Sequence, residues 1–323
     1  MLLDPVQSRA CIAKALREGR AILAVNADSP AAITDCLEAA RRTGAPIIIE
    51  TSLWQLTGHS FGAGDPVRGL VRYLVQLSAM ANAEPYRETR VLFHTDHIKG
   101  PETLRILGAA IRGVEANLCG STAHVAASSI SLDSSEFSEE ENIRHICTLC
   151  EIASEAQRDL TLEMEAGVDD GLTPPEVTKR LLSAVEEKHP GRICLWAPGL
   201  GTRHGFSAEG YPEFSAEAVA SQRALAREIA GRDIGIALHG SSGLSTEKLR
   251  EAITAGVVKV NWSSESLLIR SRAAAEYYAT HQAELEKTHP KWKATAMDHG
   301  LQSYISECYL PRVIERMELL TAL

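Results

Sequence analysis

The sequence predicts an α/β fold of the TIM (β/α)8 barrel type, and three observations lead to this fold class. Short apolar runs typical of buried parallel strands alternate with helical patterns along nearly the whole chain. Eight such runs are present, and eight strands close a TIM barrel. The main alternative is an open doubly wound sheet, but the first run is not followed by the glycine-rich turn of a dinucleotide-binding sheet.

Each predicted strand is a short β-branched or apolar run bounded by polar residues, Gly or Pro. The strands cover 21–26, 45–50, 90–94, 128–132, 160–165, 193–197, 234–238 and 257–261, and segment 114–118 competes for the fourth place. The first intervening helix begins near Ser29 and Pro30, which suit the N-cap and N1 positions. The remaining helical patterns cover 65–83, 101–112, 139–155, 174–188, 215–230 and 245–255.

No Pro/Ser/Gly-rich linker interrupts the chain, so we expect residues 1–323 to form a single barrel domain. Helical patterns at 266–286 and 304–320 flank a polar, irregular segment at 289–300. They predict a C-terminal helical extension over about 266–323.

Composition argues against several classes of protein. The chain is 45% hydrophobic and 23% charged, as in an ordinary soluble globular protein. A net charge of −9 without a Lys/Arg run argues against a nucleic-acid partner. No apolar run approaches the ~20 residues of a membrane span, and the N-terminus has no signal core. Scattered cysteines, with Cys147 and Cys150 as the close pair, indicate free thiols in a cytoplasmic protein.

Ionisable side chains gather after the predicted strands, at the barrel edge where active sites form. His97 follows the third strand, His204 lies in a glycine-rich loop after the sixth, and His239 follows the seventh. Each histidine alone is compatible with a hydrogen-bonded core residue. Three imidazoles at one edge, with a coordination position left open, are instead typical of catalytic zinc. Further candidates to orient these ligands or hold a second ion are His94, Asp133 and Glu165.

Two small-residue segments suit an anion. Segment 239–243 reads His-Gly-Ser-Ser-Gly and precedes a helix, and segment 261–264 reads Asn-Trp-Ser-Ser. The loops after the seventh and eighth strands are the usual phosphate site of a TIM barrel, through backbone amides and the dipole of a helix N-terminus. We therefore expect an anionic small molecule at these two segments.

Taken together, the motifs resemble the class II, metal-dependent fructose-bisphosphate aldolases and the related tagatose-bisphosphate aldolases. The resemblance covers nearly the whole chain and lies in segments 24–26, 93–97, 129–134 with 140–143, 162–165, 203–205, 239–243 and 256–261. It implies a lyase that cleaves a phosphorylated ketose to dihydroxyacetone phosphate, or a similar ketone, and an aldehyde. Zinc would stabilise the enediolate, so no Schiff-base lysine is needed. The resemblance also implies a homo-oligomer, either a dimer or a tetramer.

The resemblance implies a role for each matching residue. His97, His204 and His239 match the zinc ligands, and Asp96 matches the acid that protonates the aldehyde oxygen. Asp133 and Glu165 match positions that support the site or hold a second divalent or a monovalent cation. The phosphorylated donor half of the sugar would be bound at Asn26, Ser52, Gly205, Gly240, Ser241, Ser242, Asn261, Ser263 and Ser264.

The loop after the fifth strand departs from the family. The family carries a Gly-Gly-Glu loop whose glutamate removes the substrate proton, whereas segment 165–175 reads Glu-Ala-Gly-Val-Asp-Asp-Gly-Leu-Thr-Pro-Pro. Asp169 and Asp170 are the remaining candidates for the base. Ser263 replaces a family aspartate, and segment 50–54 is bulkier than usual. Two alternatives stay open: a related metal-dependent lyase for a different or modified sugar, and a non-catalytic metal- and phosphate-binding barrel.

Overall fold

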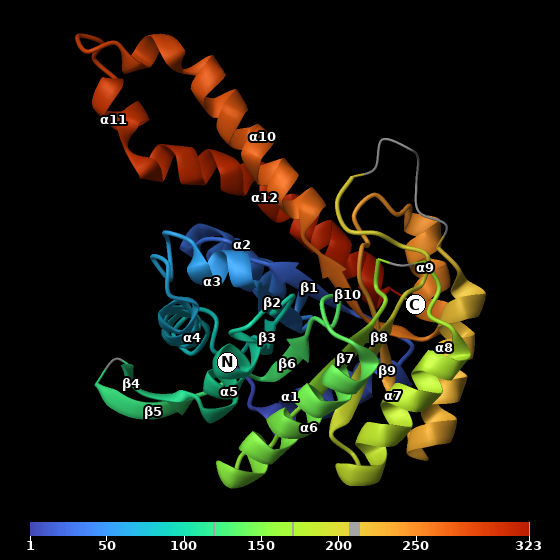
Figure 1. The fold of residues 1–323 in the computed structure, drawn as a ribbon. Coiled ribbons are helices and arrows are strands. Elements are labelled where there is room, and N and C mark those ends of the chain that lie inside the picture. Colours follow the sequence, from blue (N-terminus) through green and yellow to red (C-terminus); the bar gives the residue numbers. More distant parts are fainter. Residues whose placement is uncertain (119, 170, 207–213, 323) are drawn as a thin grey trace.

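The computed structural model describes residues 1–118, 120–169, 171–206 and 214–322. Parallel strands close into a barrel in the order β1-β10-β9-β8-β7-β6-β3-β2, so that chain order is kept around the barrel (Figure 1). The predicted TIM barrel is therefore confirmed. Its strands are β1 (Ile22–Asn26), β2 (Ile47–Thr51), β3 (Val91–Thr95), β6 (Ser129–Leu132), β7 (Leu162–Ala166), β8 (Ile193–Pro198), β9 (Gly235–Leu238) and β10 (Val257–Trp262).

The two segments that competed for the fourth barrel position are both strands, but only one belongs to the barrel. β6 pairs with β3 and β7, as predicted for segment 128–132. β4 (Val114–Leu118) pairs instead with β5 (Ser121–Val125) in an antiparallel hairpin. The side chain of Glu115 is exposed and Val114 is only half-buried, so β4 lacks the apolar faces of a barrel strand. The hairpin lies outside the barrel, beside α4 (Pro66–Ala81).

Helices cover the outside of the barrel, and polar caps fix where several of them begin. The side chain of Ser29 accepts a hydrogen bond from the backbone N of Ala32, as its predicted N-cap role requires. Asp65 caps α4 in the same way. The sequence did not predict α3 (Leu53–Thr57), because five residues are too few to show a helical period. The other covering helices are α2 (Pro30–Thr43), α5 (Thr103–Arg112), α6 (Glu139–Glu155), α7 (Pro175–Lys188), α8 (Ala216–Ala230) and α9 (Thr246–Ala255).

The two ends of the barrel interior differ in polarity. At the amino ends of the strands, apolar side chains from β1, β2 and β3 pack against α1 (Pro5–Arg17), which plugs that end. Nearer the carboxyl ends the interior becomes polar, because the strand register places Asn26 beside Glu50 and Glu50 beside His94. All three are buried. Buried polar groups are unfavourable unless they are paired or bind a ligand, so the carboxyl end of the barrel is where a site is expected.

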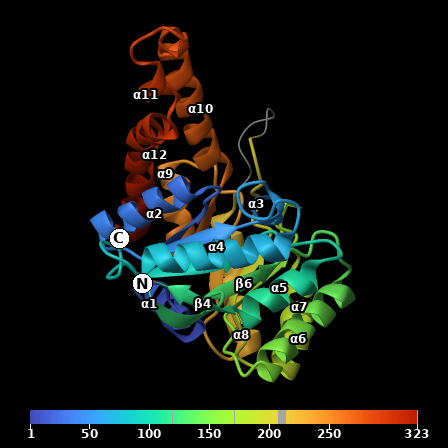
Figure 2. The same ribbon diagram turned by 90° about the vertical axis from the view of Figure 1, so that its left-hand side faces the viewer.

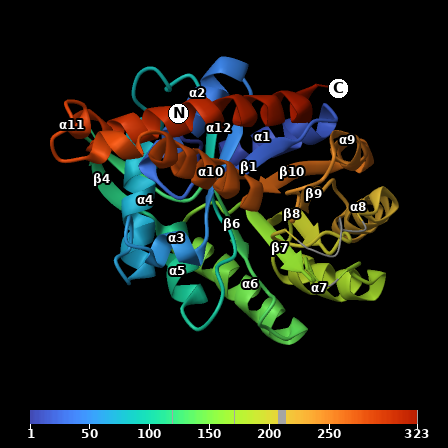
Figure 3. The ribbon, with the colours of Figure 1, turned by 90° about the horizontal axis from the view of Figure 1, so that it is seen from above.

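The C-terminal region forms an arm that projects from the barrel (Figures 1 and 2). It consists of α10 (Ser264–Thr280), the 3-10 turn η1 (Gln282–Leu285), α11 (Trp292–Ala296) and α12 (Asp298–Thr321). α12 begins earlier than the predicted 304, and α11 lies within a segment that was expected to be irregular. From the arm, α12 runs back to the barrel and packs along α2 (Figure 3). Among the described residues, no helix is long and apolar enough to cross a membrane.

Candidate active site

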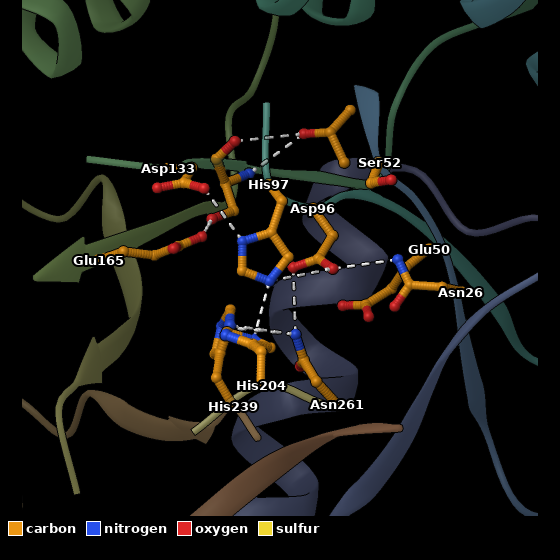
Figure 4. A network of polar contacts seen from close by, with 12 residues as sticks. Asn26, Glu50, Ser52, Asp96, His97, Asp133, Glu165, His204, His239 and Asn261 are labelled. Carbon is orange, nitrogen blue, oxygen red and sulfur yellow. Dashed lines mark hydrogen bonds and ion pairs between the residues drawn. The ribbon is translucent and has the colours of Figure 1, made fainter. Parts of the chain in front are cut away.

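Three imidazole rings converge at the polar end of the barrel (Figure 4). His97 follows β3 and has a positive φ of 50°, a strained backbone conformation for a residue other than glycine. Its Nε2 atom lies 2.9 Å from Nε2 of His204, which comes from the loop after β8. The ring centroid of His239, after β9, lies 5.3 Å from that of His97 and 5.6 Å from that of His204. One nitrogen from each ring falls within 4.8 Å of the other two.

One nitrogen of each imidazole ring contacts a carboxylate. The pairs are His97 Nδ1 with Asp133 Oδ2 (3.1 Å), His204 Nδ1 with both oxygens of Asp169 (2.9 Å), and His239 Nε2 with Glu163 Oε1 (2.8 Å). Carboxylates behind imidazoles fix the tautomer and orientation of histidines that bind a metal through their other nitrogen. The donor set therefore fits a divalent metal: three imidazole nitrogens converge, and each ring is held from behind.

The electrostatics of the cluster favour positive charge at its centre. Burial opposes a proton on His97, but the charge of Asp96 and the hydrogen bond to Asp133 outweigh burial and raise the pKa of His97 to about 10. Burial likewise opposes ionisation of Asp96, yet His97, His239 and Lys259 hold its pKa below the usual value. Such surroundings attract a cation, whether a proton or a metal ion.

Asp96 is held between two asparagine side chains. It is 1% exposed, and its Oδ2 accepts a hydrogen bond from Asn26 Nδ2 (3.0 Å). Its Oδ1 accepts one from Asn261 Nδ2 (3.1 Å). Nε2 of His97 lies 3.7 Å from Asp96 Oδ2. The sequence predicted that both asparagines bind substrate; in the structure their amide groups orient the carboxylate of Asp96.

Two further carboxylates lie close to His97. Ligand atoms of Asp133 and Glu165 come within 4.8 Å of one another and of a His97 nitrogen, and Glu165 forms a second such group with Asp96 and His239. Glu165 contacts the hydroxyl of Ser131, and burial raises its pKa well above the usual value. The structure thus brings together all five residues for which the sequence predicted a metal-binding role: Asp133, Glu165, His97, His204 and His239.

Beneath the histidines lies a buried lysine whose direction the sequence left open. Lys259 Nζ lies 2.7 Å from Glu50 Oε1 and 2.9 Å from Glu163 Oε2, and all three side chains are fully buried. Burial raises the pKa of Glu50 to about 8. Burial acts on Glu163 too, but the charge of Lys259 outweighs it and lowers the pKa of Glu163. Burial opposes the charge on Lys259, but Glu163 and Glu50 outweigh burial and raise the pKa of Lys259, which keeps it an ammonium ion rather than a Schiff-base nucleophile.

Sequence reasoning assigned no role to Glu163 and left Lys259 undecided. A signal for both was present in strand alternation, because residues two apart point to the same face of a strand. Glu163 is two residues before Glu165, and Lys259 is two residues before Asn261. Each of these pairs faces the barrel interior, where Glu163 links His239 to Lys259.

The structure describes one of the two candidate bases, Asp169. Asp169 contacts the ring of His204 and also accepts a hydrogen bond from the backbone N of His204 (2.8 Å). Burial opposes ionisation of Asp169, but the contacts with His204 lower its pKa to about 2. Asp169 therefore holds His204 in place, and its role as the base stays a prediction. Asp170 lies outside the described residues.

The two segments predicted to bind an anion lie side by side. The hydroxyl of Ser241 donates to the carbonyl oxygen of Asn261, and the hydroxyl of Ser242 accepts from the backbone N of Glu265 (3.1 Å). Gly240 has a φ of 63°, and a Cβ there would lie 2.6 Å from the carbonyl oxygen of Arg203. Only glycine allows the loops after β8 and β9 to approach so closely.

The remaining predicted donor-binding residues lie on the same edge of the barrel. Ser263 and Ser264 form the beginning of α10, directly after β10. Gly205 follows His204 and has a φ of 83°. Ser52, near Asp96 in Figure 4, follows β2, and its backbone N donates to Gln55 Oε1 (2.8 Å) at the start of α3.

Comparison with known proteins identifies the family. The family model described as "Fructose-bisphosphate aldolase class-II" matches residues 6–314. The chain belongs to this family. Among related sequences, a protein named fructose-bisphosphate aldolase from Candida albicans is 27% identical over 276 residues, covering 78% of this chain and 74% of that protein. One from Streptococcus pyogenes serotype M3 is 26% identical over 281 residues, covering 86% and 85%.

Solved aldolase structures share the fold. Fructose-bisphosphate aldolase from Campylobacter jejuni gives a TM-score of 0.78 at 20% identity and covers 100% of this chain and 96% of that chain. The YdjI aldolase from Escherichia coli K12 gives 0.68 at 20% identity and covers 99% and 97%. Membership of the class-II aldolase family makes the protein a metal-dependent aldolase that cleaves a phosphorylated ketose. The predicted family, the lyase activity and a requirement for a divalent metal are thus confirmed.

Proposed function

We propose that His97, His204 and His239 bind Zn²⁺ in this aldolase. The observation that carries the proposal is the convergence of three imidazole nitrogens within 4.8 Å, each ring being held from behind by a carboxylate. Zinc prefers such nitrogen donors and keeps a position open for substrate in catalytic sites. Asp133 and Glu165 stand beside His97, which supports a second role for them in holding a further divalent or a monovalent cation.

Asp96 is the acid of the proposed mechanism. The chemistry that zinc held by His97, His204 and His239 would supply is polarisation of the ketose carbonyl and stabilisation of negative charge on the donor half. The chain supplies the proton: Asp96, oriented by the amides of Asn26 and Asn261, faces the same space as His97. In cleavage the Asp96 carboxylate, which its surroundings keep ionised, takes the proton from the hydroxyl that becomes the aldehyde oxygen. In condensation the protonated Asp96 returns this proton to the aldehyde oxygen.

The phosphorylated half of the sugar is proposed to bind where the loops after β9 and β10 meet. Backbone amides in glycine- and serine-rich turns and the start of α10 supply donors for a phosphate. The contacts of Ser241 with Asn261 and of Ser242 with Glu265 keep these turns together, which supports the proposal. The proposed donor-binding residues are Asn26, Ser52, Gly205, Gly240, Ser241, Ser242, Asn261, Ser263 and Ser264.

We further propose that the protein is a cytoplasmic homo-oligomer. The arm carries exposed apolar side chains, and exposed apolar surface on a projecting element is typical of a subunit interface. These side chains are Tyr278 (44% exposed), Leu285 (41%), Trp292 (47%) and Met297 (54%). The described cysteines are free thiols, as expected in a reducing compartment. Sedimentation analysis should give a dimer or tetramer, and a monomer at micromolar concentration would contradict this proposal.

A substrate panel tests the proposed function. Purified protein would be assayed for cleavage of fructose and tagatose bisphosphates and of a set of ketose monophosphates, before and after treatment with a chelator and again after zinc is restored. We expect cleavage of at least one phosphorylated ketose, loss of activity on chelation and recovery with zinc. Cleavage of monophosphates alone would favour the alternative of a different sugar substrate. Cleavage of none, with zinc and phosphate still bound, would favour a non-catalytic barrel.

A further inference from the structure

Arg316 reaches the loop after β9 from the C-terminal helix α12. Its Nη2 atom donates to the carbonyl oxygen of Ser241 (3.1 Å) and approaches the Ser241 hydroxyl (3.4 Å). The two residues are 75 positions apart in the chain. α12 runs along the side of the barrel past the end of β10, as Figure 3 shows, and also contacts α9. The C-terminal helix is therefore in direct contact with one of the two proposed phosphate loops.

The other branch of the guanidinium faces the second loop. Nη1 of Arg316 lies 3.6 Å from Oε2 of Glu265, in the first turn of α10. The same oxygen accepts a hydrogen bond from Trp262 Nε1 (2.8 Å), and the backbone N of Glu265 donates to Ser242. Arg316 thus connects the loop after β9 with the start of α10. A planar, forked guanidinium can hold two groups in a fixed relation, which a single ammonium cannot.

An aromatic stack holds the guanidinium in place. Its central carbon lies 5.4 Å from the ring centroid of Trp262, the last residue of β10. Trp262 stacks on Tyr309 of α12 with ring centroids 6.0 Å apart and planes 7° from parallel, and the guanidinium carbon of Arg270 lies 5.3 Å from the ring centroid of Tyr309. The Arg316 side chain is only 11% exposed. A guanidinium stays charged at this depth, and contacts with the ring face and with polar partners offset its burial.

We infer that Arg316 is a positioning residue for phosphate binding: its fork, seated on Trp262, holds the loop after β9 and the start of α10 at the spacing that lets both contact one phosphate. The inference rests on the proposed binding of the phosphorylated donor at these two segments. The contacts of Arg316 are with the carbonyl and hydroxyl of Ser241 and with Glu265, so its effect on the ligand passes through the loops. Its positive charge adds an attraction for a phosphate anion in a buried, weakly screened place.

Two substitutions of Arg316 distinguish the forked geometry of its guanidinium from its positive charge. Arg316→Met removes both, whereas Arg316→Lys keeps a positive charge but cannot contact Ser241 and Glu265 with one rigid group. Arg312→Met is the matched control, because Arg312 lies one turn earlier on α12 and its exposed side chain pairs with Glu315. The dissociation constant of inorganic phosphate would be measured by calorimetry on the zinc-loaded proteins. KM and kcat for the best ketose phosphate, zinc content and thermal stability would be measured alongside.

We expect Arg316→Met to weaken phosphate binding and raise KM by about tenfold, the range for loss of hydrogen bonds to a charged group. Arg316→Lys should weaken both severalfold, with kcat and zinc content close to those of the parent and of Arg312→Met. Phosphate binding by Arg316→Lys equal to that of the parent would overturn the role of the fork, even if Arg316→Met failed to fold. An effect on kcat with unchanged phosphate binding would overturn it as well. A parent protein that binds no phosphate would instead contradict the proposed function.

Discussion

The Nε2 atoms of His97 and His204 face each other at 2.9 Å, while the Nδ1 atom of each ring contacts a carboxylate. A carboxylate partner favours a proton on Nδ1, which leaves a lone pair on Nε2. Two lone pairs at this distance repel unless a cation lies between them or close to both. The pair is therefore arranged to share a positive centre, and His239 supplies a third nitrogen at the same place.

Replacing one ring of this pair should remove the metal. We expect His204→Ala to lose most of its bound zinc on gel filtration and to lose cleavage activity with it, because two nitrogens hold zinc far more weakly than three. Metal analysis of the eluted protein gives the zinc content per chain. His299→Ala is the control, since His299 is exposed on α12. Full zinc content in His204→Ala would contradict the assignment of the site.

Asp96→Ala should separate chemistry from metal binding. Proton transfer by a placed side chain contributes about 10²- to 10⁴-fold to rate, so we expect kcat to fall by that range. Zinc content should stay at the parent level, because the histidine rings keep the carboxylates that hold them from behind. Steady-state kinetics and metal analysis of the same preparation provide the two measurements. Parent-level kcat would exclude Asp96 as the acid.

Asp169→Asn distinguishes two roles for Asp169. Because both its oxygens contact His204 Nδ1, we expect the substitution to weaken zinc affinity, by about 10- to 100-fold as for other residues that support a metal ligand. Competition with a chelator of known affinity measures this effect. Asp159→Asn, an exposed change before β7, serves as the control. Unchanged zinc affinity together with a large loss of kcat would instead support Asp169 as the base.

The barrel and its histidines were predictable because both depend on local patterns. Short apolar runs identify the strands, and their carboxyl ends lie on one edge of any TIM barrel. His97, His204 and His239 could therefore be placed together before their distances were known. The hairpin of β4 and β5 was not predictable, because segment 114–118 alternates apolar and polar residues and so competes with segment 128–132 for the fourth barrel strand. The exposure of Glu115 and the antiparallel pairing with β5 place it outside the barrel.

The supporting groups were harder to predict because they depend on tertiary contacts. Strand alternation indicates that Lys259 and Asn261 share a face. It does not predict that Glu50 and Glu163, on other strands, contact the ammonium group of Lys259. No local sequence pattern predicts the position of the Arg316 guanidinium. The helical pattern of α12 gives its buried side, but only packing against the barrel brings its guanidinium to Ser241.

The buried Glu50 should make stability depend on pH in a definite direction. Burial raises its pKa from the ordinary value of 4.5 to about 8, so between these values the folded protein holds a proton that the unfolded chain has released. The stabilisation from this proton is complete below pH 4.5 and is lost as pH rises through about 8. For metal-free protein, we expect this group to lower the free energy of unfolding with rising pH, by up to about 1.4 kcal/mol per pH unit.

Glu50→Gln removes this ionisation and keeps an oxygen that accepts from Lys259. We expect the variant to lose the contribution of Glu50, so its unfolding free energy, measured by urea denaturation from pH 5 to pH 8, should fall less steeply than that of the parent. Glu228→Gln, an exposed change on α8, should keep the slope of the parent. Equal slopes in all three proteins would mean that Glu50 is ionised throughout this range. Lys259 would then be paired with two ionised, buried carboxylates. The net charge around the metal site would be more negative by one than it is with a protonated Glu50.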